Sequence, residues 1–445
     1  MTTPISDFVQ AYREKAPLRF HMPGHKGVGD PALEGADLTE VGGADSLYEA
    51  EGIIAESEEN ASRLFGSAHS FYSAEGSSLA IRAMLALFVM HERERGRVPC
   101  ILAARNCHRV FLSAAALLGI RVEFLPAGDS YLSASVTEGE LARRLTPEVG
   151  AVYLTSPDYL GHITKIAPLA RLCHERGALL LVDNAHGAYL KFLSPSLHPL
   201  DGGADLVADS AHKTLPVLTG GAYLHVGKNA PALFAREGRR ALALFGSTSP
   251  SYLILASLDR CNARLAGDLP AALEKTEREV SALKNALLAG GLSLTGDEPL
   301  KVTVCPKSRG YTGAEVADLL RGQGIEAEFS DPDHVVFMIT PQNGEAALSR
   351  LEGALLALPR RAPLLARPPR PAAGERALPP ALAILSPGER IPVKESAGRI
   401  LGDFSVGCPP AVPILTVGER IGEDALEAFR YYGIRTVTAV KEGKD

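Results

Sequence analysis

The feature that most constrains the fold is a regular alternation of short apolar β-type runs with helical stretches between Phe65 and about Gly227. This alternation is typical of a mostly parallel sheet that helices cover on both faces. The expected strands are Ser70–Tyr72, Ile101–Ala103, Arg121–Leu125, Ala151–Thr155, Leu179–Val182, Leu206–Ala208 and Gly221–His225. Helices are expected between them, over Leu79–Arg95, Val110–Leu118 and Pro168–Glu175.

Changes in composition divide the 445 residues into further parts. We expect residues 1–265 to form a large domain with an N-terminal arm, and residues 266–358, which open with an amphipathic helix around Leu269–Leu288, to form a smaller α/β domain. Pro, Arg and Ala dominate residues 359–380, which is typical of an extended linker. Apolar periodicity returns in residues 381–445, where we expect a small C-terminal cap.

Composition excludes several functional classes. A net charge of −6 without a Lys/Arg-rich block gives no electrostatic footprint for nucleic acid or an anionic membrane. The N-terminus carries charge too early for a signal peptide, and the most apolar stretch, Leu79–Met90, is interrupted by Arg82 and far too short to span a bilayer. We therefore expect a cytoplasmic protein whose partner is a small molecule or another protein.

The cysteines give no sign of a metal or redox site. None of the six forms a CxxC pair, so we expect reduced, mostly buried thiols and no bound metal. They are Cys100, Cys107, Cys173, Cys261, Cys305 and Cys408.

Two polar segments, Asp183–Gly187 and Asp209–Thr214, directly follow two expected strands. Because ligands of open α/β sheets lie beyond the carboxyl ends of strands, an acid and a lysine can converge there on one ligand. Pyridoxal phosphate needs a lysine that holds its aldehyde as an imine and a carboxylate that keeps its ring nitrogen protonated. The pattern therefore predicts Asp183 at the ring nitrogen and Lys213 as the Schiff-base lysine.

A phosphate cradle and a flat group over the ring are also needed. The segment Gly76-Ser77-Ser78 opens an expected helix, where backbone N–H groups and the helix dipole favour an anion. His108 follows the strand Ile101–Ala103, so its imidazole can lie against the ring. Ser210 and His212 flank Lys213 closely enough to reach the phosphate.

Each of these features also has a plainer interpretation. Gly-Ser-Ser is more often an ordinary helix N-cap, and His108 alone is more often a loop histidine with satisfied hydrogen bonds. Asp183 can equally be a helix cap and Lys213 a surface lysine. The occurrence of the right residue types at successive strand ends favours the cofactor site.

Seven segments together resemble the ornithine/lysine/arginine decarboxylase family. They are FHMPGHKG (Phe20–Gly27), LTEVGGADSLYEAEGIIAESEENASRLFGS (Leu38–Ser67), SPDYLG (Ser156–Gly161), LLVDNAHGAYLKF (Leu180–Phe192), SAHKTLPVLTGGAYLHV (Ser210–Val226), STSPSYLILASLD (Ser247–Asp259) and GCPPAVPILTVGERI (Gly407–Ile421), which is similar to the family's PPGIP…PGE element. The resemblance implies the aspartate-aminotransferase fold, called fold type I, with pyridoxal phosphate as cofactor. It also implies a seven-stranded large domain, a smaller α/β domain and a C-terminal cap.

Residue roles follow from the resemblance. It implies that Lys213 forms the Schiff base, that Asp183 pairs with the ring nitrogen and that His108 stacks on the ring. The other implied cofactor contacts are Gly76, Ser77, Ser78, Ala185, Ser210, His212 and, from the partner subunit, Thr248. A homodimer at least, with active sites shared between subunits, is implied. Because FHMPGHKG begins only at Phe20, we expect the protein to lack the receiver-like N-terminal domain of the large bacterial members.

The chain departs from the family pattern at positions that bear on the substrate. An acid of the related DEAHGAH pattern is replaced by Asn184, and other departures are Glu75, Leu79, Cys408 and Ala411. The distal positive group of a basic substrate needs an acidic partner, for which Asp158 and Glu51 are candidates, although each can also serve as a cap or a solvated loop charge.

Three functions remain open at this point. The first is decarboxylation of ornithine, lysine or arginine to the amine and carbon dioxide, a reaction of polyamine biosynthesis, with His186 and His212 as candidates for proton transfer. The second is another reaction of the same cofactor, catalysed by an aminotransferase or a lyase. The third is a non-catalytic relative, against which the presence of Lys213 and Asp183 argues.

Overall fold

The structure is a computed structural model that describes residues 1–126, 130–369, 374–404 and 411–442. The chain divides into two compact units, which are described separately. The first unit contains Met1–Pro99, Gly150–Ser156 and Lys165–Glu274, and the second contains Cys100–Val149, Pro157–Thr164 and Lys275–Asp445. The four-part domain division expected from the sequence remains a prediction.

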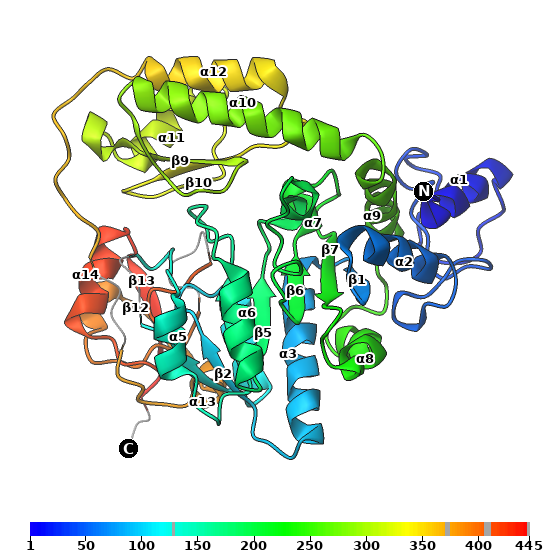
Figure 1. Ribbon diagram of the computed structural model, residues 1–445, viewed down its shortest axis with the longest axis horizontal. Helices are drawn as coiled ribbons and strands as arrows, with labels where there is room; N and C mark the ends of the chain where they lie inside the picture. Colours follow the sequence, from blue (N-terminus) through cyan, green and yellow to red (C-terminus); the bar gives the residue numbers. More distant parts are fainter. Residues whose placement is uncertain (127–129, 370–373, 405–410, 443–445) are drawn as a thin grey trace. The chain divides into compact units, whose positions relative to one another are not determined.

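The secondary-structure elements alternate along much of the chain (Figure 1). The strands are β1 (His69–Ser73), β2 (Cys100–Ala103), β3 (Arg121–Phe124), β4 (Ala151–Thr155), β5 (Leu179–Asp183), β6 (Leu206–Asp209), β7 (Ala222–Val226), β8 (Ser293–Thr295), β9 (Lys301–Cys305), β10 (Phe329–Ser330), β11 (Val335–Met338), β12 (Gly388–Pro392) and β13 (Thr436–Val440). The helices are α1 (Pro4–Lys15), α2 (Ile53–Phe65), α3 (Gly76–Glu94), α4 (Arg109–Leu117), α5 (Glu138–Arg144), α6 (Ile166–Glu175), α7 (Ala211–Thr214), α8 (Ala232–Ala243), α9 (Tyr252–Leu265), α10 (Leu269–Ala289), α11 (Gly313–Arg321), α12 (Gly344–Leu356), α13 (Pro380–Leu385) and α14 (Glu423–Tyr431).

The largest sheet over the described residues has seven strands in the order β1-β7-β6-β5-β4-β2-β3. Strands β4, β5 and β6 run parallel, as do β2 and β3, whereas β7 is antiparallel to both β6 and β1. The mostly parallel seven-stranded sheet is confirmed, and each predicted strand agrees with an observed one to within one residue at either end. Strands β5, β6 and β7 are buried along their whole length, as expected of strands with both faces covered.

In the first unit, α3 lies along β6 and β7, and α8 packs against α3 (Figure 1). Residues Leu79–Val89 of α3 are almost all buried, because the helix is apolar around most of its circumference. The helix begins with Gly76-Ser77-Ser78, just after the carboxyl end of β1. The sequence predicted a ligand at this place. Helices α1, α2, α8 and α9 were not among the predicted elements.

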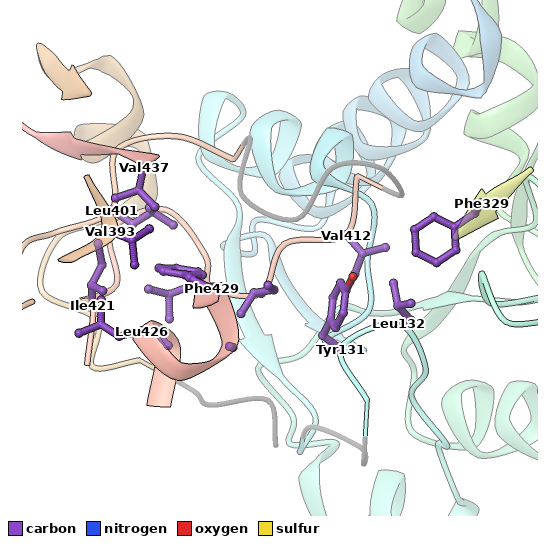
Figure 2. Close-up of a cluster of buried hydrophobic side chains, with 14 of the residues drawn as sticks. Tyr131, Leu132, Phe329, Val393, Leu401, Val412, Ile421, Leu426, Phe429 and Val437 are labelled. Carbon is purple, nitrogen blue, oxygen red and sulfur yellow. The ribbon is translucent and has the colours of Figure 1, made fainter. Parts of the chain in front are cut away.

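The second unit contains two smaller antiparallel sheets, β10-β11-β9-β8 and β12-β13. A buried apolar cluster in this unit includes Leu401, Ile421, Leu426, Phe429 and Val437, whose side chains gather around one another in Figure 2. The same cluster includes Tyr131, Leu132, Leu160, Phe329 and Val336, so the C-terminal region shares its apolar core with earlier segments of the second unit.

Residues 359–369 form no helix or strand. Among the described residues, no helix combines the length and the apolar character needed to cross a membrane. Within the same residues the cysteines are mostly buried, as predicted, with Cys305 half-buried. Cys408 lies outside the described residues.

Candidate active site

Lys213 lies in the single turn of α7, directly after β6. Its Nζ is 2.9 Å from Nε2 of His186, a buried residue that follows β5. Because an ammonium group has only donors, Lys213 donates this hydrogen bond and His186 accepts it. The structure therefore brings together two of the predicted catalytic residues, and the imidazole is placed to take a proton from the amine.

Asp183 is the last residue of β5, and it is 2% exposed. Its Oδ1 accepts the backbone N–H of Ala185 at 3.1 Å, and its Oδ2 accepts the Tyr153 hydroxyl at a long 3.4 Å. Burial raises the pKa of Asp183 to about 6, although the charge of Lys213 opposes this shift. A buried carboxylate that is so weakly compensated fits a cationic ring N–H, which is the partner that pyridoxal phosphate offers.

The start of α3 holds the predicted phosphate cradle. The hydroxyl of Ser210 donates to the Ser77 hydroxyl at 2.7 Å, so the segments after β6 and β1 meet at the positive end of this 19-residue helix. Gly76 has a φ of +71° and donates its N–H to Gly220 O at 2.7 Å, and a side chain at Gly76 would meet nothing within 4 Å. Two hydroxyls and open space at a helix N-terminus fit a phosphate group.

His212 and Thr248 also belong to the first unit. Nδ1 of His212 donates to Gly221 O at 3.1 Å, which orients its ring from the backbone of the segment before β7. Thr248 is exposed, and the N–H of the preceding Ser247 donates to Glu75 Oε1 at 2.6 Å. The STSP segment thus begins beside the phosphate loop of its own chain.

His108 belongs to the second unit and is the N-cap of α4, where its Nδ1 accepts the N–H of Val110 at 3.1 Å. The next residue, Arg109, donates its N–H to Ala411 O at 2.8 Å. The C-terminal element therefore holds the segment that carries His108. Stacking of its imidazole on the cofactor ring remains a prediction.

A second contact ties the same segment to the C-terminal element. Arg105 donates two hydrogen bonds to Glu419, at 2.9 and 2.8 Å, and both side chains are about 95% buried. The bidentate geometry matches a planar guanidinium to a carboxylate. Residues 407–410 of this element lie outside the described residues.

Asp158, a candidate for reading the substrate's distal charge, is engaged within its own turn. Its Oδ1 accepts the N–H groups of Leu160 and His162, both at 2.9 Å, and its Oδ2 contacts His162 Nδ1 at 2.9 Å. This hydrogen bond raises the pKa of His162. The geometry supports the plainer interpretation of Asp158 as a loop-organising residue, whereas Glu51 is exposed.

The sequence interpretation missed a buried group next to the lysine segment. Asp209, the last residue of β6, contacts His198 and His225 through its carboxylate. Tyr153, which reaches Asp183 from β4, was missed as well. The one available signal was the position of Asp209 directly before Ser210, at the same end of the sheet as Asp183.

Comparisons with known proteins place this geometry in a class. The structure of the lysine decarboxylase LdcF from Francisella novicida superposes with a TM-score of 0.80 at 16% sequence identity, over 99% of this chain and 81% of that one. That likeness shows the fold, which is fold type I of the pyridoxal-phosphate enzymes.

Sequence comparison narrows the class to a family. The family model described as Orn/Lys/Arg decarboxylase, major domain, matches residues 3–286, so the chain belongs to the Orn/Lys/Arg decarboxylase family. Among its relatives, the uncharacterized protein YaaO of Bacillus subtilis is 32% identical over 78% of this chain and 76% of its own length. The arginine decarboxylase of Halalkalibacterium halodurans is 30% identical over 92% of this chain and 88% of its own length. The chain is a pyridoxal-phosphate-dependent decarboxylase, and the cofactor predicted from Asp183 and Lys213 is confirmed.

Proposed function

We propose that this decarboxylase removes the α-carboxylate of a basic amino acid and releases the corresponding amine and carbon dioxide. The observation that carries the proposal is the hydrogen-bonded pair of Lys213 and His186 with buried Asp183 in the same unit. Family membership supports it further.

Pyridoxal phosphate, when bound, supplies the electron sink for the electron pair that the departing carboxylate leaves at Cα. In the proposed site Lys213 would be the amine that holds the cofactor aldehyde, and Asp183 would pair with the ring nitrogen. His186 accepts the hydrogen bond from Nζ at 2.9 Å, so its imidazole would be placed to take the proton whose loss makes Lys213 a neutral, nucleophilic amine. The hydroxyls of Ser77 and Ser210, with the N-terminus of α3, would hold the phosphate.

Arginine is the first substrate to test, because a relative named arginine decarboxylase matches along 92% of the chain. The distal guanidinium must be paired if it leaves water, since an unpaired buried charge costs several kcal/mol. Glu51 stays a candidate for this role, because its side chain is exposed, whereas the Asp158 carboxylate is taken up by its own turn. The enzyme is further proposed to act in the cytoplasm as a homodimer with shared active sites.

The test has two parts. Borohydride reduction of the holoenzyme followed by peptide mapping should place the cofactor on Lys213, and a label on Lys26 or Lys191 would contradict the site. A panel of ornithine, lysine, arginine and uncharged amino acids should then give carbon dioxide and amine in equal amounts from one basic member. Keto-acid formation without carbon dioxide would point instead to an aminotransferase.

A further inference from the structure

Asp209 is a fully buried carboxylate to which the proposed chemistry assigns no role. Its Oδ2 lies 2.9 Å from Nε2 of His198 and 3.2 Å from Nε2 of His225, and all three side chains have zero exposure. Its Oδ1 accepts the side-chain amide of Asn184 at 2.7 Å. The carboxylate is therefore surrounded by three donors from three separate segments.

The rings of the two histidines are oriented by hydrogen bonds on their other nitrogens. Leu200 donates its N–H to Nδ1 of His198 at 3.3 Å, which leaves the ring proton on Nε2, facing Asp209. Burial lowers the pKa of His225, so this ring is neutral near pH 7, and the Ser70 hydroxyl at 2.7 Å can donate to its Nδ1. Burial by itself would raise the pKa of Asp209, but electrostatic attraction and hydrogen bonds from His198 and His225 outweigh it and hold that pKa well below its usual range. Asp209 thus stays ionised in the folded protein.

Asn184 connects this charge to the lysine–acid site. Its N–H donates to Ala208 O at 2.9 Å, and its carbonyl accepts the N–H of Gly187 at 2.8 Å, which closes the turn after β5. A β-carbon at Gly187 would come within 2.0 Å of the Asn184 amide oxygen, so the turn packs closely around the Asn184 side chain. This turn carries Asp183 before it and His186 within it. A displacement of Asn184 would therefore move both residues.

We propose that Asp209 is a second carboxylate of the cofactor site, a positioning residue that holds the Asp183–His186 turn through Asn184 and adds a permanent negative charge beside it. This inference rests on the proposed function, which places the cofactor at Lys213 and Asp183. The negative charge favours the cationic forms of the ring nitrogen and of the lysine-bound nitrogen, because opposite charges stabilise each other in a poorly solvated interior. In agreement, Asp209 contributes to the raised pKa of Asp183.

The Asn184 amide is the direct link between the two parts of the site, since it donates to Asp209 Oδ1 at 2.7 Å. The charged and titratable groups that act on the two carboxylates are His198, His225 and Tyr223 around Asp209, Tyr153 and Lys213 beside Asp183, and Lys191, which acts on His225.

A metal ion is the alternative occupant of this cluster, because the ligand atoms of His198, Asp209 and His225 lie within 4.8 Å of one another. Hydrogen bonding explains the spacing better. The proton on Nε2 of His198 points at Asp209, and Oδ1 of Asp209 is already engaged by Asn184.

The test is Asp209→Asn in the full-length holoenzyme. Loss of the charge should weaken binding of pyridoxal phosphate to the apoenzyme by roughly tenfold. It should also lower the pH at which the visible absorption of the bound cofactor changes, by roughly 0.5–1 unit, because a positive charge loses a stabilising neighbour. Unchanged affinity and an unchanged absorption profile would overturn the proposal.

The matched control is Asp205→Asn. Asp205 directly precedes β6, about 13 Å along the strand from Asp209. It is 4% exposed and accepts hydrogen bonds from His174 Nε2 at 2.9 Å and from Leu180 N at 2.7 Å. This variant should lower stability but leave the cofactor affinity and absorption profile unchanged. If Asp205→Asn changes the cofactor affinity and the absorption profile as much as Asp209→Asn does, then loss of any buried acid has this effect. The proposal then fails.

A charge exchange covers the case in which Asp209→Asn does not fold. In the double variant Asn184→Asp with Asp209→Asn, the amide oxygen at 209 accepts from the two histidines and its NH₂ donates to the new carboxylate. Recovery of cofactor affinity and of the absorption profile would support the proposal, and a double variant that folds but recovers neither would overturn it. Stoichiometric metal in the purified protein would overturn it as well. Borohydride labelling of Lys213 is read separately in each variant, so a failed cofactor assignment is not confused with a failed role for Asp209.

Discussion

The Asp183 carboxylate should reduce stability as long as no cofactor is bound. Its pKa is raised by burial to about 6 from a usual value of 3.8. Between these two values the unfolded chain loses its proton while the folded chain keeps it, so the free energy of unfolding falls as pH rises through this window. Above pH 6 the full cost remains, on the order of 2–3 kcal/mol.

Replacing Asp183 with Asn should therefore stabilise the apoenzyme at pH 7.5 and have no such effect below about pH 4, where both carboxyl forms are neutral. Urea unfolding of apoenzyme at several pH values measures this difference. With cofactor present the advantage should shrink, because the ring cation pairs with the native carboxylate. Equal stability of the two proteins at every pH would show that Asp183 is better solvated than its burial indicates.

The same residues show what a sequence can and cannot predict about a site. Asp183 and Lys213 were predictable, because each directly follows a strand whose apolar pattern is unmistakable. The meeting of Asp209 with His198 and His225 was not. His198 lies in an irregular loop, and His225 reaches Asp209 only because β7 pairs with β6 in antiparallel register. Neither the loop path nor the register is encoded in a local pattern.

At the level of elements, the packing of α8 on β1 depends on one glycine. A β-carbon at Gly238 would come within 2.1 Å of the Phe71 ring, whereas one at Gly353, in α12, would meet nothing within 4 Å. Helix propensity favours alanine over glycine by up to about 1 kcal/mol, but overpacking a core contact costs about 1–3 kcal/mol. Gly238→Ala should thus destabilise the protein and Gly353→Ala should stabilise it slightly, as thermal unfolding will show. Effects of the same sign would refute the packing argument.

The C-terminal element depends on the ion pair of Arg105 and Glu419. Removing one partner leaves a buried charge uncompensated, which costs about 3–5 kcal/mol, whereas replacing both removes the charge from each side. Glu419→Met and Arg105→Met should each lower the free energy of unfolding strongly, and the double variant should lose less than the sum of the two. Denaturant unfolding of all four proteins measures the coupling. Additive losses would mean that the two residues stabilise the fold independently.

The strands of the large sheet were predicted better than helices α8 and α9. The sheet strands agree with the sequence pattern because a strand buried on both faces reads as an unbroken apolar run. Helices α8 and α9 were harder to predict, because their sequences mix charged and small residues with the apolar ones and begin without a side-chain cap. These two helices are buried by contacts with distant parts of the chain, and such contacts leave no local sequence pattern.

At the level of the whole molecule, the N-terminal arm exposes large apolar side chains although its backbone is tied down. Leu18, Phe20 and Val28 are 87%, 92% and 77% exposed, respectively. Arg19 donates to Glu34 O at 3.1 Å and to Gly35 O at 2.7 Å, which holds the arm in a defined shape. Exposed apolar groups on an ordered segment favour burial against a partner. This supports the proposed homodimer.

The last prediction concerns sharing of active sites in that dimer. If Thr248 reaches the phosphate of the partner's site, mixing a Lys213→Ala chain with a Thr248→Val chain produces heterodimers in which one site carries both lesions and the other is intact. Random exchange should then restore about a quarter of wild-type activity, since half of the dimers are mixed and each has one intact site.

The control is a mixture of Lys213→Ala with Asp183→Ala, two lesions within one unit of the chain. Every site then keeps one lesion, and no activity should return. Thr248 lies in the segment that begins beside Glu75 of its own chain. The competing result is therefore that Thr248 acts on the phosphate site of its own chain. It would be shown by proven subunit exchange with no rise above the Thr248→Val parent.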